Sequence, residues 1–222
     1  MAPYRGVIFD IDGTLVDSND AHARAWVRSF ADQGIEVSFR QVRPLIGMGG
    51  DQLVPHVSGI VKGDVRYQAL SDGWQRHFQE ELPGLRSQLG SRALLDALRA
   101  RGLRLIAGTS TDEALVSDLL RIADVQDILT KHTTASDVDA SKPEPDIVRA
   151  AVAKLGLAPS EVLMVGDTPF DVASAHKAGV DTVALRCGGD DRFSGAVAVY
   201  DSPQDWLDHL DDSPLGPGHQ AG

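Results

Sequence analysis

The run DIDGT at residues 10–14 places two carboxylates, Asp10 and Asp12, directly after an apolar run at residues 7–9. The apolar run predicts a buried strand, and ligands of open parallel sheets bind beyond the carboxyl ends of the strands. Two carboxylates this close repel each other unless a cation lies between them or one takes a proton. A cation-bound carboxylate can attack phosphorus, and a protonated carboxyl can protonate a leaving oxygen. The motif is therefore typical of a nucleophile beside a general acid, although a simple turn of Asp and Gly gives the same pattern when it stands alone.

Two later segments could bind a phosphate group. The apolar run 103–107 ends in GTST at residues 108–111, and hydroxyls and amides at a strand-to-helix turn can bind phosphate oxygens. Lys142 lies in the sequence SKPEP, where two prolines restrict the backbone and so define the position of the lysine. Taken separately, Ser and Thr are ordinary helix caps, and most lysines are solvated surface charges.

The sequence GDTPFD at residues 166–171 follows the apolar run 162–165 and offers two more carboxylates, Asp167 and Asp171. Acidic residues are also common at helix N-termini, where the helix dipole stabilises them. The ordered set of DxDGT, a strand-terminal Thr or Ser, a Lys and GDxxxD nevertheless resembles the pattern of the haloacid dehalogenase superfamily in its phosphatase branch. The group that the chain resembles is that of the phosphoglycolate phosphatases and β-phosphoglucomutases, and the resemblance covers the chain apart from its tail.

The resemblance implies a reaction chemistry, with magnesium as the cofactor. Asp10 corresponds to the nucleophile that becomes an aspartyl-phosphate, and Asp12 corresponds to the general acid that later acts as a base. Asp167 corresponds to a magnesium ligand, beside Asp10 and the backbone carbonyl of Asp12, and Asp171 to the outer acid that orients metal-bound water. Carboxylate oxygens with retained waters are the coordination that magnesium prefers. The seven histidines lack ligand spacing, which disfavours zinc.

The resemblance also implies a set of phosphate-binding residues. Thr109 corresponds to the hydroxyl that binds the transferring phosphoryl group, with Ser110 adding its backbone amide, and Thr111 is the alternative hydroxyl. Lys142 corresponds to the cation that neutralises Asp10 and the phosphoryl oxygens. We therefore predict a magnesium-dependent phosphatase that hydrolyses a small phosphorylated metabolite.

Strand and helix patterns alternate over most of the chain. Helical patterns close at Gly156 and Gly179, the kind of residue that commonly ends a helix. The alternation predicts an α/β fold, a Rossmann-like parallel sheet with helices on both faces. The predicted strands are residues 7–9, 103–107, 162–165, 182–185 and 197–199.

Residues 18–82 interrupt this alternation with helical patterns and no strand signal. We expect four helices there, and the resemblance implies that they form a small α-helical cap domain that closes over the site and selects the substrate. The core domain would then comprise residues 1–17 and 83–211. Residues 212–222 have almost no apolar side chains, and we expect them to form a disordered tail.

His22 and Trp26 follow the first motif in the first predicted cap helix. We interpret Trp26 as a core residue. His22 faces either a polar side or the hinge, and a role in substrate binding or gating is the alternative. The second predicted cap helix has Ser38 as a candidate N-cap.

Other activities are weaker interpretations of the same motifs. A phosphosugar mutase of the β-phosphoglucomutase type grips a second phosphate through an Arg in the loop after the second cap helix, where this chain has Gly49 and Gly50. A dehalogenase lacks the second Asp of the first motif, which is present here as Asp12. A phosphonatase needs a cap lysine with a lowered pKa, and the sequence around Lys62 is not apolar enough to produce one. A non-catalytic phosphometabolite-binding protein is disfavoured because every catalytic position is filled.

Composition limits the partners and the compartment. The chain has 222 residues, a formal net charge of -11 and a pI of about 4.9. So acidic a surface repels phosphate backbones and anionic lipids, and we expect neither nucleic acid nor a membrane as partner. The sequence has no apolar run of membrane-spanning length and no leader pattern, so we expect a cytoplasmic protein. Its one cysteine, Cys187, excludes an internal disulfide and is interpreted as a small buried apolar residue.

Overall fold

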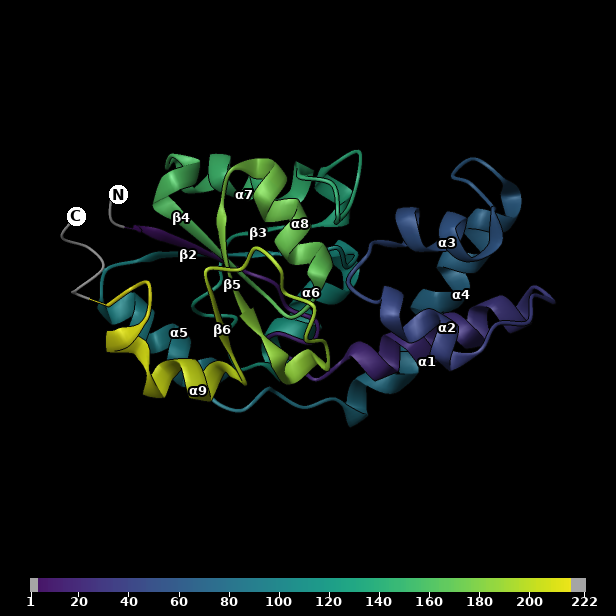
Figure 1. Ribbon diagram of the computed structural model, residues 1–222. Coiled ribbons are helices and arrows are strands. Elements are labelled where there is room, and N and C mark those ends of the chain that lie inside the picture. Colours follow the sequence, from purple (N-terminus) through teal and green to yellow (C-terminus); the bar gives the residue numbers. More distant parts are fainter. Residues whose placement is uncertain (1–3, 217–222) are drawn as a thin grey trace.

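The computed structural model describes residues 4–216, and within them six strands form one sheet (Figure 1). The strand order is β3-β2-β1-β4-β5-β6, and every neighbouring pair is parallel. The predicted parallel sheet is therefore confirmed, with β1 between β2 and β4 at its centre. The strands are β1 (Gly6–Phe9), β2 (Arg104–Gly108), β3 (His132–Thr133), β4 (Val162–Gly166), β5 (Asp181–Leu185) and β6 (Ala198–Tyr200).

The apolar runs in the sequence match every strand except β3, and their ends agree to within one residue. β3 has two residues, His132 and Thr133, which is too short for any periodic pattern. It forms because its backbone pairs with the end of β2, where Gly108 lies opposite Thr133. Tertiary pairing, rather than local sequence, creates this edge strand.

Helices cover both faces of the sheet (Figure 1). Ile8 points to one face and packs with Ala151 of α7 and Ala175 of α8. The preceding residue, Val7, points to the opposite face and belongs to the cluster that includes Leu95 of α5. The predicted helices on both faces are confirmed. The helices that follow β1 and its insert are α5 (Ser91–Ala100), α6 (Glu113–Ile122), α7 (Asp146–Leu155), α8 (Pro169–Ala178) and α9 (Pro203–Asp208).

The predicted helical insert is also present, and it lies to one side of the sheet (Figure 1). Its two long helices, α1 and α4, pack against each other through stacked aromatic rings. Trp26 of α1 lies 5.4 Å from Trp74 of α4, measured between ring centroids. The interpretation of Trp26 as a buried residue is confirmed, since 4% of it is exposed. The helices of the insert are α1 (Asn19–Asp32), α2 (Phe39–Val42), α3 (Gly50–Ser58) and α4 (Val65–Glu81).

Local signals set several helix ends. Ser38 precedes α2, and its backbone N–H donates to the side-chain oxygen of Gln41 at 2.9 Å. Gly156 and Gly179 end α7 and α8 in the left-handed conformation that glycine adopts without strain. Short 3-10 helices connect the main elements at Arg43–Leu45, Leu82–Gly84, Ala135–Asp137, Pro159–Glu161, Arg186–Gly188 and Leu210–Asp212.

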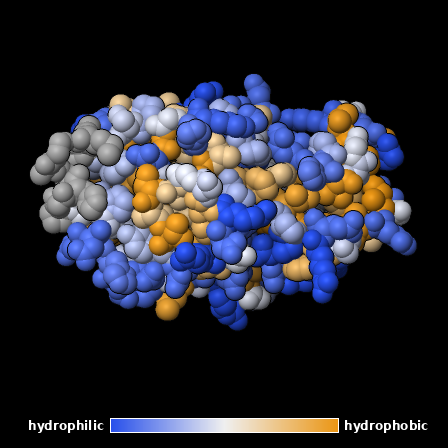
Figure 2. Space-filling model, in the orientation of Figure 1, coloured by the Kyte–Doolittle hydropathy of each residue, from blue (hydrophilic) through white to orange (hydrophobic). Residues whose placement is uncertain are grey.

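The carboxyl-terminal segment is ordered further than its composition predicts. Ser213 and Leu215 are buried, and Leu215 belongs to the main hydrophobic core. The structure therefore differs at these positions from the expected tail, and residues 217–222 lie outside the described residues. No helix among residues 4–216 combines the length and apolar character needed to cross a membrane. Figure 2 shows hydrophilic side chains over much of the face drawn, with apolar patches over both the sheet domain and the helical insert.

Candidate active site

Polar side chains gather where the central strands end. Asp10 follows β1, Thr109 follows β2 and Asp167 follows β4. Because β1 pairs in parallel with both β2 and β4, these three residues lie at the same edge of the sheet. The backbone N–H of Asp10 continues the ladder by donating to the carbonyl of Val165 at 2.9 Å. The fold thus brings the predicted motifs together although they are far apart in the sequence.

A buried lysine joins two of the predicted carboxylates. Nζ of Lys142 lies 2.6 Å from Oδ1 of Asp10 and 2.8 Å from Oδ1 of Asp171. Burial lowers the pKa of Lys142, but the charges of Asp10 and Asp171 outweigh burial and raise this pKa above its usual value. The ammonium group therefore stays charged in a position where 1% of the side chain is exposed. The position of this lysine is thus fixed, as expected from the two prolines that follow it in the sequence.

The same carboxylates form a group that could hold a metal ion. One oxygen from each of Asp10, Asp167 and Asp171 lies within 4.8 Å of the others, and all three residues are buried. Burial raises the pKa of Asp10, against the lowering charge of Lys142, and burial together with the charge of Asp171 raises the pKa of Asp167 to about 7. Three buried carboxylates beside one ammonium leave a negative charge that a divalent cation would compensate. The residues therefore fit a divalent metal site.

Two side chains that the sequence reasoning did not assign hold Asp167 in place. Oγ1 of Thr14 donates to its Oδ1 at 2.9 Å, and Nδ2 of Asn19 donates to its Oδ2 at 2.6 Å. Gly13, which precedes Thr14, has a φ of +77°, and a Cβ at this position would overlap the carboxylate of Asp167. Glycine is thus required both by the backbone angle and by the close approach. Thr14 lies inside the first motif, so the motif could have identified it as a site residue. Asn19 lies outside the motifs, and no pattern in the sequence marks it.

Asp12 lies apart from the acidic group and has its own partners. Its Oδ1 accepts from Oγ of Ser18 at 2.6 Å and lies 2.8 Å from Nε2 of His22, while its Oδ2 accepts from Oγ1 of Thr111 at 2.6 Å. Burial raises the pKa of Asp12, but the charge of His22 and these hydrogen bonds outweigh burial and lower it to about 2. His22 is buried and its ring is stacked on Phe78 at a centroid distance of 3.8 Å. His22 therefore contacts a predicted catalytic residue rather than a merely polar surface.

The three hydroxyls after β2 have different environments. Oγ1 of Thr109 accepts from the backbone N–H of Thr111 at 3.0 Å, and Thr111 uses its own hydroxyl to donate to Asp12. Oγ of Ser110 is buried and has no hydrogen-bond partner within residues 4–216. The hydroxyl of Thr111 is thus committed to Asp12, which leaves Thr109 and Ser110 as the hydroxyls of this turn with capacity for a ligand.

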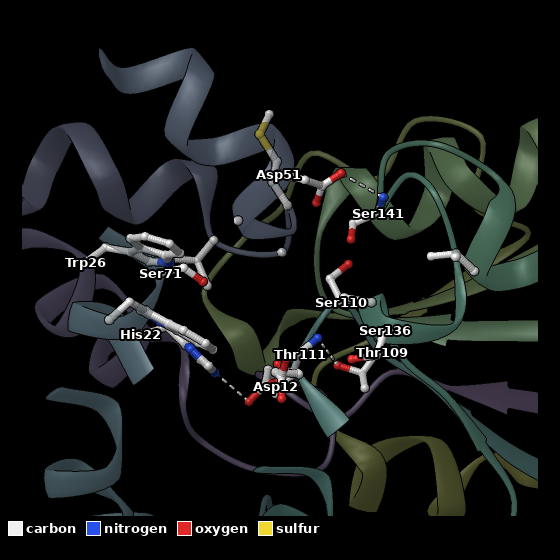
Figure 3. Close-up of a pocket in the computed structure, with 18 of the residues that line it drawn as sticks. Asp12, His22, Trp26, Asp51, Ser71, Thr109, Ser110, Thr111, Ser136 and Ser141 are labelled. Carbon is white, nitrogen blue, oxygen red and sulfur yellow. Dashed lines mark hydrogen bonds and ion pairs between the residues drawn. The ribbon is translucent and has the colours of Figure 1, made fainter. Parts of the chain in front are cut away.

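A cavity of about 280 Å³ opens between the sheet edge and the helical insert. Its walls include Asp10 and Asp12 from the first motif, and His22, Trp26 and Trp74 from the insert. Figure 3 shows the labelled side chains arranged around this space, with Asp12 at one side and Asp51 at the opposite side. The glycine-rich loop at residues 47–50 reaches the site, because residues 46–48 and 50 line the same cavity.

The glycine-rich loop rests directly on the sheet domain. The backbone N–H of Gly49 donates to the carbonyl of Lys142 at 3.4 Å, and that of Ser141 donates to Oδ2 of Asp51 at 3.0 Å. A Cβ at Gly49 would overlap the side chain of Ser141, so the contact requires glycine. The insert therefore meets the sheet domain beside the lysine that holds Asp10.

Comparisons with known proteins agree with this geometry. The family of haloacid dehalogenase-like hydrolases matches residues 7–185 of the chain. The phosphoglycolate phosphatase of Rhodospirillum rubrum is 33% identical over 218 residues, covering 91% of this chain and 90% of that protein. The fructose-1-phosphate phosphatase YqaB of Escherichia coli is 25% identical over 189 residues, covering 82% of this chain and 97% of that protein. The crystal structure of a hydrolase from Pseudomonas syringae matches with a TM-score of 0.87 at 28% identity, covering 93% of this chain and 98% of that one.

The parallel sheet, its helical insert and the buried carboxylates at the sheet edge define a hydrolase of the phosphatase type. The chain belongs to the haloacid dehalogenase-like hydrolases, in the branch of phosphoglycolate phosphatases and CbbY proteins. The resemblance inferred from four short motifs is thereby confirmed over most of the chain.

Proposed function

We propose that the protein is a magnesium-dependent phosphatase that hydrolyses a small phosphomonoester through an aspartyl-phosphate on Asp10. The observation that carries this proposal is the place of Asp10. It lies at the end of β1, 2.6 Å from Nζ of Lys142, within the acidic group and at the wall of the cavity. With a divalent cation bound beside the fixed ammonium, this carboxylate would stay ionised and would be positioned to attack phosphorus in line with a leaving oxygen.

In the first half-reaction a carboxylate oxygen of Asp10 forms a bond to phosphorus as the bond from phosphorus to the substrate oxygen breaks. Asp12 gives its proton to the departing alkoxide, which leaves as an alcohol. In the second half-reaction the carboxylate of Asp12 takes a proton from water, and the water oxygen displaces Asp10 from phosphorus. Phosphate is released and both aspartates return to their starting states.

Asp12 must carry a proton to act as the acid, although its pKa is about 2 in the free site. A phosphoryl group bound beside it adds negative charge, and a nearby negative charge raises the pKa of a carboxyl. The hydrogen bonds from Ser18 and Thr111 hold the side chain in one orientation throughout. Substrate binding itself is thus proposed to convert Asp12 to its acid form.

Other groups compensate the charge of the transferring phosphoryl group. Lys142, the hydroxyl of Thr109 and the backbone amide of Ser110 are proposed to bind its oxygens. Asp10, Asp167 and the backbone carbonyl of Asp12 would hold the magnesium ion, and Asp171 would orient its water. When bound, the ion supplies positive charge next to the phosphoryl oxygens.

The helical insert is proposed to act as a cap domain of residues 18–82 over a core of residues 1–17 and 83–211. The contacts of Gly49 and Asp51 with the loop that carries Lys142 support a closed arrangement. Closure excludes water from the site and strengthens the charge interactions inside it. The phosphatases among the relatives act on phosphoglycolate and fructose 1-phosphate, which supports a small phosphorylated metabolite as the substrate.

Phosphate release from p-nitrophenyl phosphate in the presence of magnesium tests the proposal. We expect turnover by the wild type, and we expect Asp10→Asn to reduce it by a factor of at least about a thousand, because an amide is a poor nucleophile. Asp96→Asn, a change of the same kind on the outer surface of α5, is the control and should keep wild-type turnover. Retention of more than a few per cent of activity by Asp10→Asn would overturn the covalent mechanism. Absence of turnover by the wild type would favour the alternative of a non-catalytic binding protein.

A further inference from the structure

Asp51 places a carboxylate in the cavity on the side away from the reaction aspartates (Figure 3). It is the second residue of α3 and follows the glycine-rich loop. Its Oδ2 accepts from the backbone N–H of Ser141 at 3.0 Å and from Nε2 of Gln52 at 3.1 Å. These bonds fix the side chain across the boundary between the insert and the sheet domain. Its position is therefore defined by contacts and not left to solvent.

The second oxygen of this carboxylate is available to a ligand. Within residues 4–216, Oδ1 of Asp51 accepts no hydrogen bond. The charge of Asp51 affects a neighbouring side chain of the cavity wall. Burial, and after it the charge of Asp51, raise the pKa of Tyr67. A ligand hydroxyl that reached Oδ1 would donate a charge-assisted hydrogen bond. A ligand anion in the same place would meet a like charge.

The wall next to Asp51 is aromatic. Trp26 and Trp74 are stacked with an angle of 18° between their planes, and both line the cavity. Aromatic faces suit the C–H surfaces of a hydroxylated carbon chain.

Lys62 is the one lysine or arginine among the cavity-lining residues of the described chain, and His22, the other basic residue there, contacts Asp12. Lys62 is exposed, whereas Asp51 is half-buried and held by a backbone amide. Solvent screens an exposed charge more strongly than a partly buried one. The field at the end of the cavity that faces the insert is therefore set by Asp51 rather than by Lys62.

We propose that Asp51 is a specificity determinant that selects phosphomonoesters with a neutral, hydroxyl-bearing organic part and disfavours substrates with a second anionic group. The inference rests on the proposed function, because the phosphate end of the substrate is placed at Asp10 and Lys142. The rest of the molecule then extends toward Asp51 and the two tryptophans. A carboxylate or a second phosphate on that part is repelled.

The test compares kcat/KM for fructose 1-phosphate, whose organic part is neutral, with kcat/KM for phosphoglycolate, which carries a carboxylate. For the wild type we expect a ratio of at least about 10 in favour of fructose 1-phosphate. Asp51→Asn removes the charge and keeps an oxygen that can accept from Ser141. It should lower the ratio by about tenfold, with phosphoglycolate gaining and fructose 1-phosphate losing. Asp139→Asn removes an exposed carboxylate of the same cavity and should leave the ratio within about twofold.

The outcomes separate this inference from the proposed function. Turnover of both substrates with a wild-type ratio below 1, or with a ratio that Asp51→Asn leaves unchanged, overturns the role of Asp51 and leaves the phosphatase intact. A loss of phosphoglycolate turnover in Lys62→Gln, with no change in Asp51→Asn, overturns it in favour of Lys62. Absence of turnover with every phosphomonoester overturns both proposals. The wild-type ratio decides the matter even if Asp51→Asn does not fold.

Discussion

Nε2 of His22 lies 2.8 Å from Oδ1 of Asp12, and this contact joins the first helix of the insert to the first motif of the sheet domain. The imidazole is stacked on Phe78 of α4 and lies 5.6 Å from the ring of Trp74, again between centroids. A side chain fixed by two aromatic neighbours can in turn fix the carboxylate that it contacts. We therefore assign His22 as a positioning residue for Asp12.

The contact of His22 with Asp12 can be removed by a substitution that preserves the stacking of the ring on Phe78. His22→Phe keeps an aromatic ring against Phe78 and removes the hydrogen bond to Asp12. We expect kcat to fall by about 10- to 100-fold with KM within about threefold, because Asp12 loses its orientation after substrate has bound. His77→Phe is the control, since buried His77 contacts Asp32, 2.8 Å away, and is not part of the cavity wall. A similar fall in kcat for both variants, or a change confined to KM, would contradict the assignment.

Lys142 is expected to stabilise the fold as well as the reaction. Lys142→Met leaves Asp10 and Asp171 buried without their cation, and loss of one partner from a buried pair destabilises by about 3 kcal/mol or more. For a chain of this length Tm should fall by about 6–12 °C in metal-free buffer. Lys177→Met removes an exposed partner of Glu144 and should change Tm by no more than about 3 °C. Equal shifts for the two variants in thermal unfolding would show that the buried pair adds nothing to stability.

Metal binding should be visible without any substrate. Magnesium that binds the folded acidic group, and not the unfolded chain, raises Tm with concentration. Asp167→Asn removes one carboxylate of that group and should abolish most of this rise. Phosphate release should also stop in excess EDTA, and calcium should inhibit it because its looser coordination disturbs in-line attack. Full activity in EDTA, or a wild-type Tm that magnesium does not move, would exclude the assigned metal site.

The contact between Gly49 and Ser141 should matter for catalysis more than for folding. In Gly49→Ala the added methyl group overlaps the side chain of Ser141, so the loop must move away from the sheet domain. We expect kcat/KM to fall by about tenfold or more, since a small misplacement of positioning groups is costly to catalysis. Gly84→Ala, where an added Cβ would meet nothing within 4 Å, is the matched control and should have wild-type kinetics. Steady-state kinetics that do not distinguish these two variants would argue against a role for the loop contact.

Cys187 should react slowly with thiol reagents in the folded protein. Burial is the main cause that raises the pKa of its thiol to about 12, and Sγ lies 3.2 Å from the carbonyl oxygen of Gly13. Because the thiolate is the reactive form, a raised pKa leaves almost none of it at pH 8. We expect modification by Ellman's reagent to be about a thousandfold slower in the native than in the unfolded protein. Rapid stoichiometric labelling of the native protein at pH 8 would contradict this environment.

The sequence alone predicted the fold class and indicated which candidate site residues lie together at one edge of the sheet. Continuous apolar runs predicted the central strands, because a parallel sheet buried on both faces needs apolar residues at every position. Each run was followed by a polar residue at the strand end, so the order of motifs also located Asp10, Thr109 and Asp167 at one edge of the sheet. Turn and helix signals along residues 18–82 predicted the insert for the same local reason.

The tertiary structure decided what local pattern cannot express. β3 exists because two residues pair with the end of β2, and Leu215 is buried because it packs into the main hydrophobic core, although few apolar residues surround it in the sequence. The contacts of His22 with Asp12 and of Asp51 with Ser141 join residues of the insert to the rest of the site. No periodicity or composition in the sequence indicates that either pair is in contact, since each contact depends on the angle at which the insert meets the sheet. That angle is set by the packing of side chains from distant parts of the chain, and it is this packing that gives the cavity its walls and the charge at its far end.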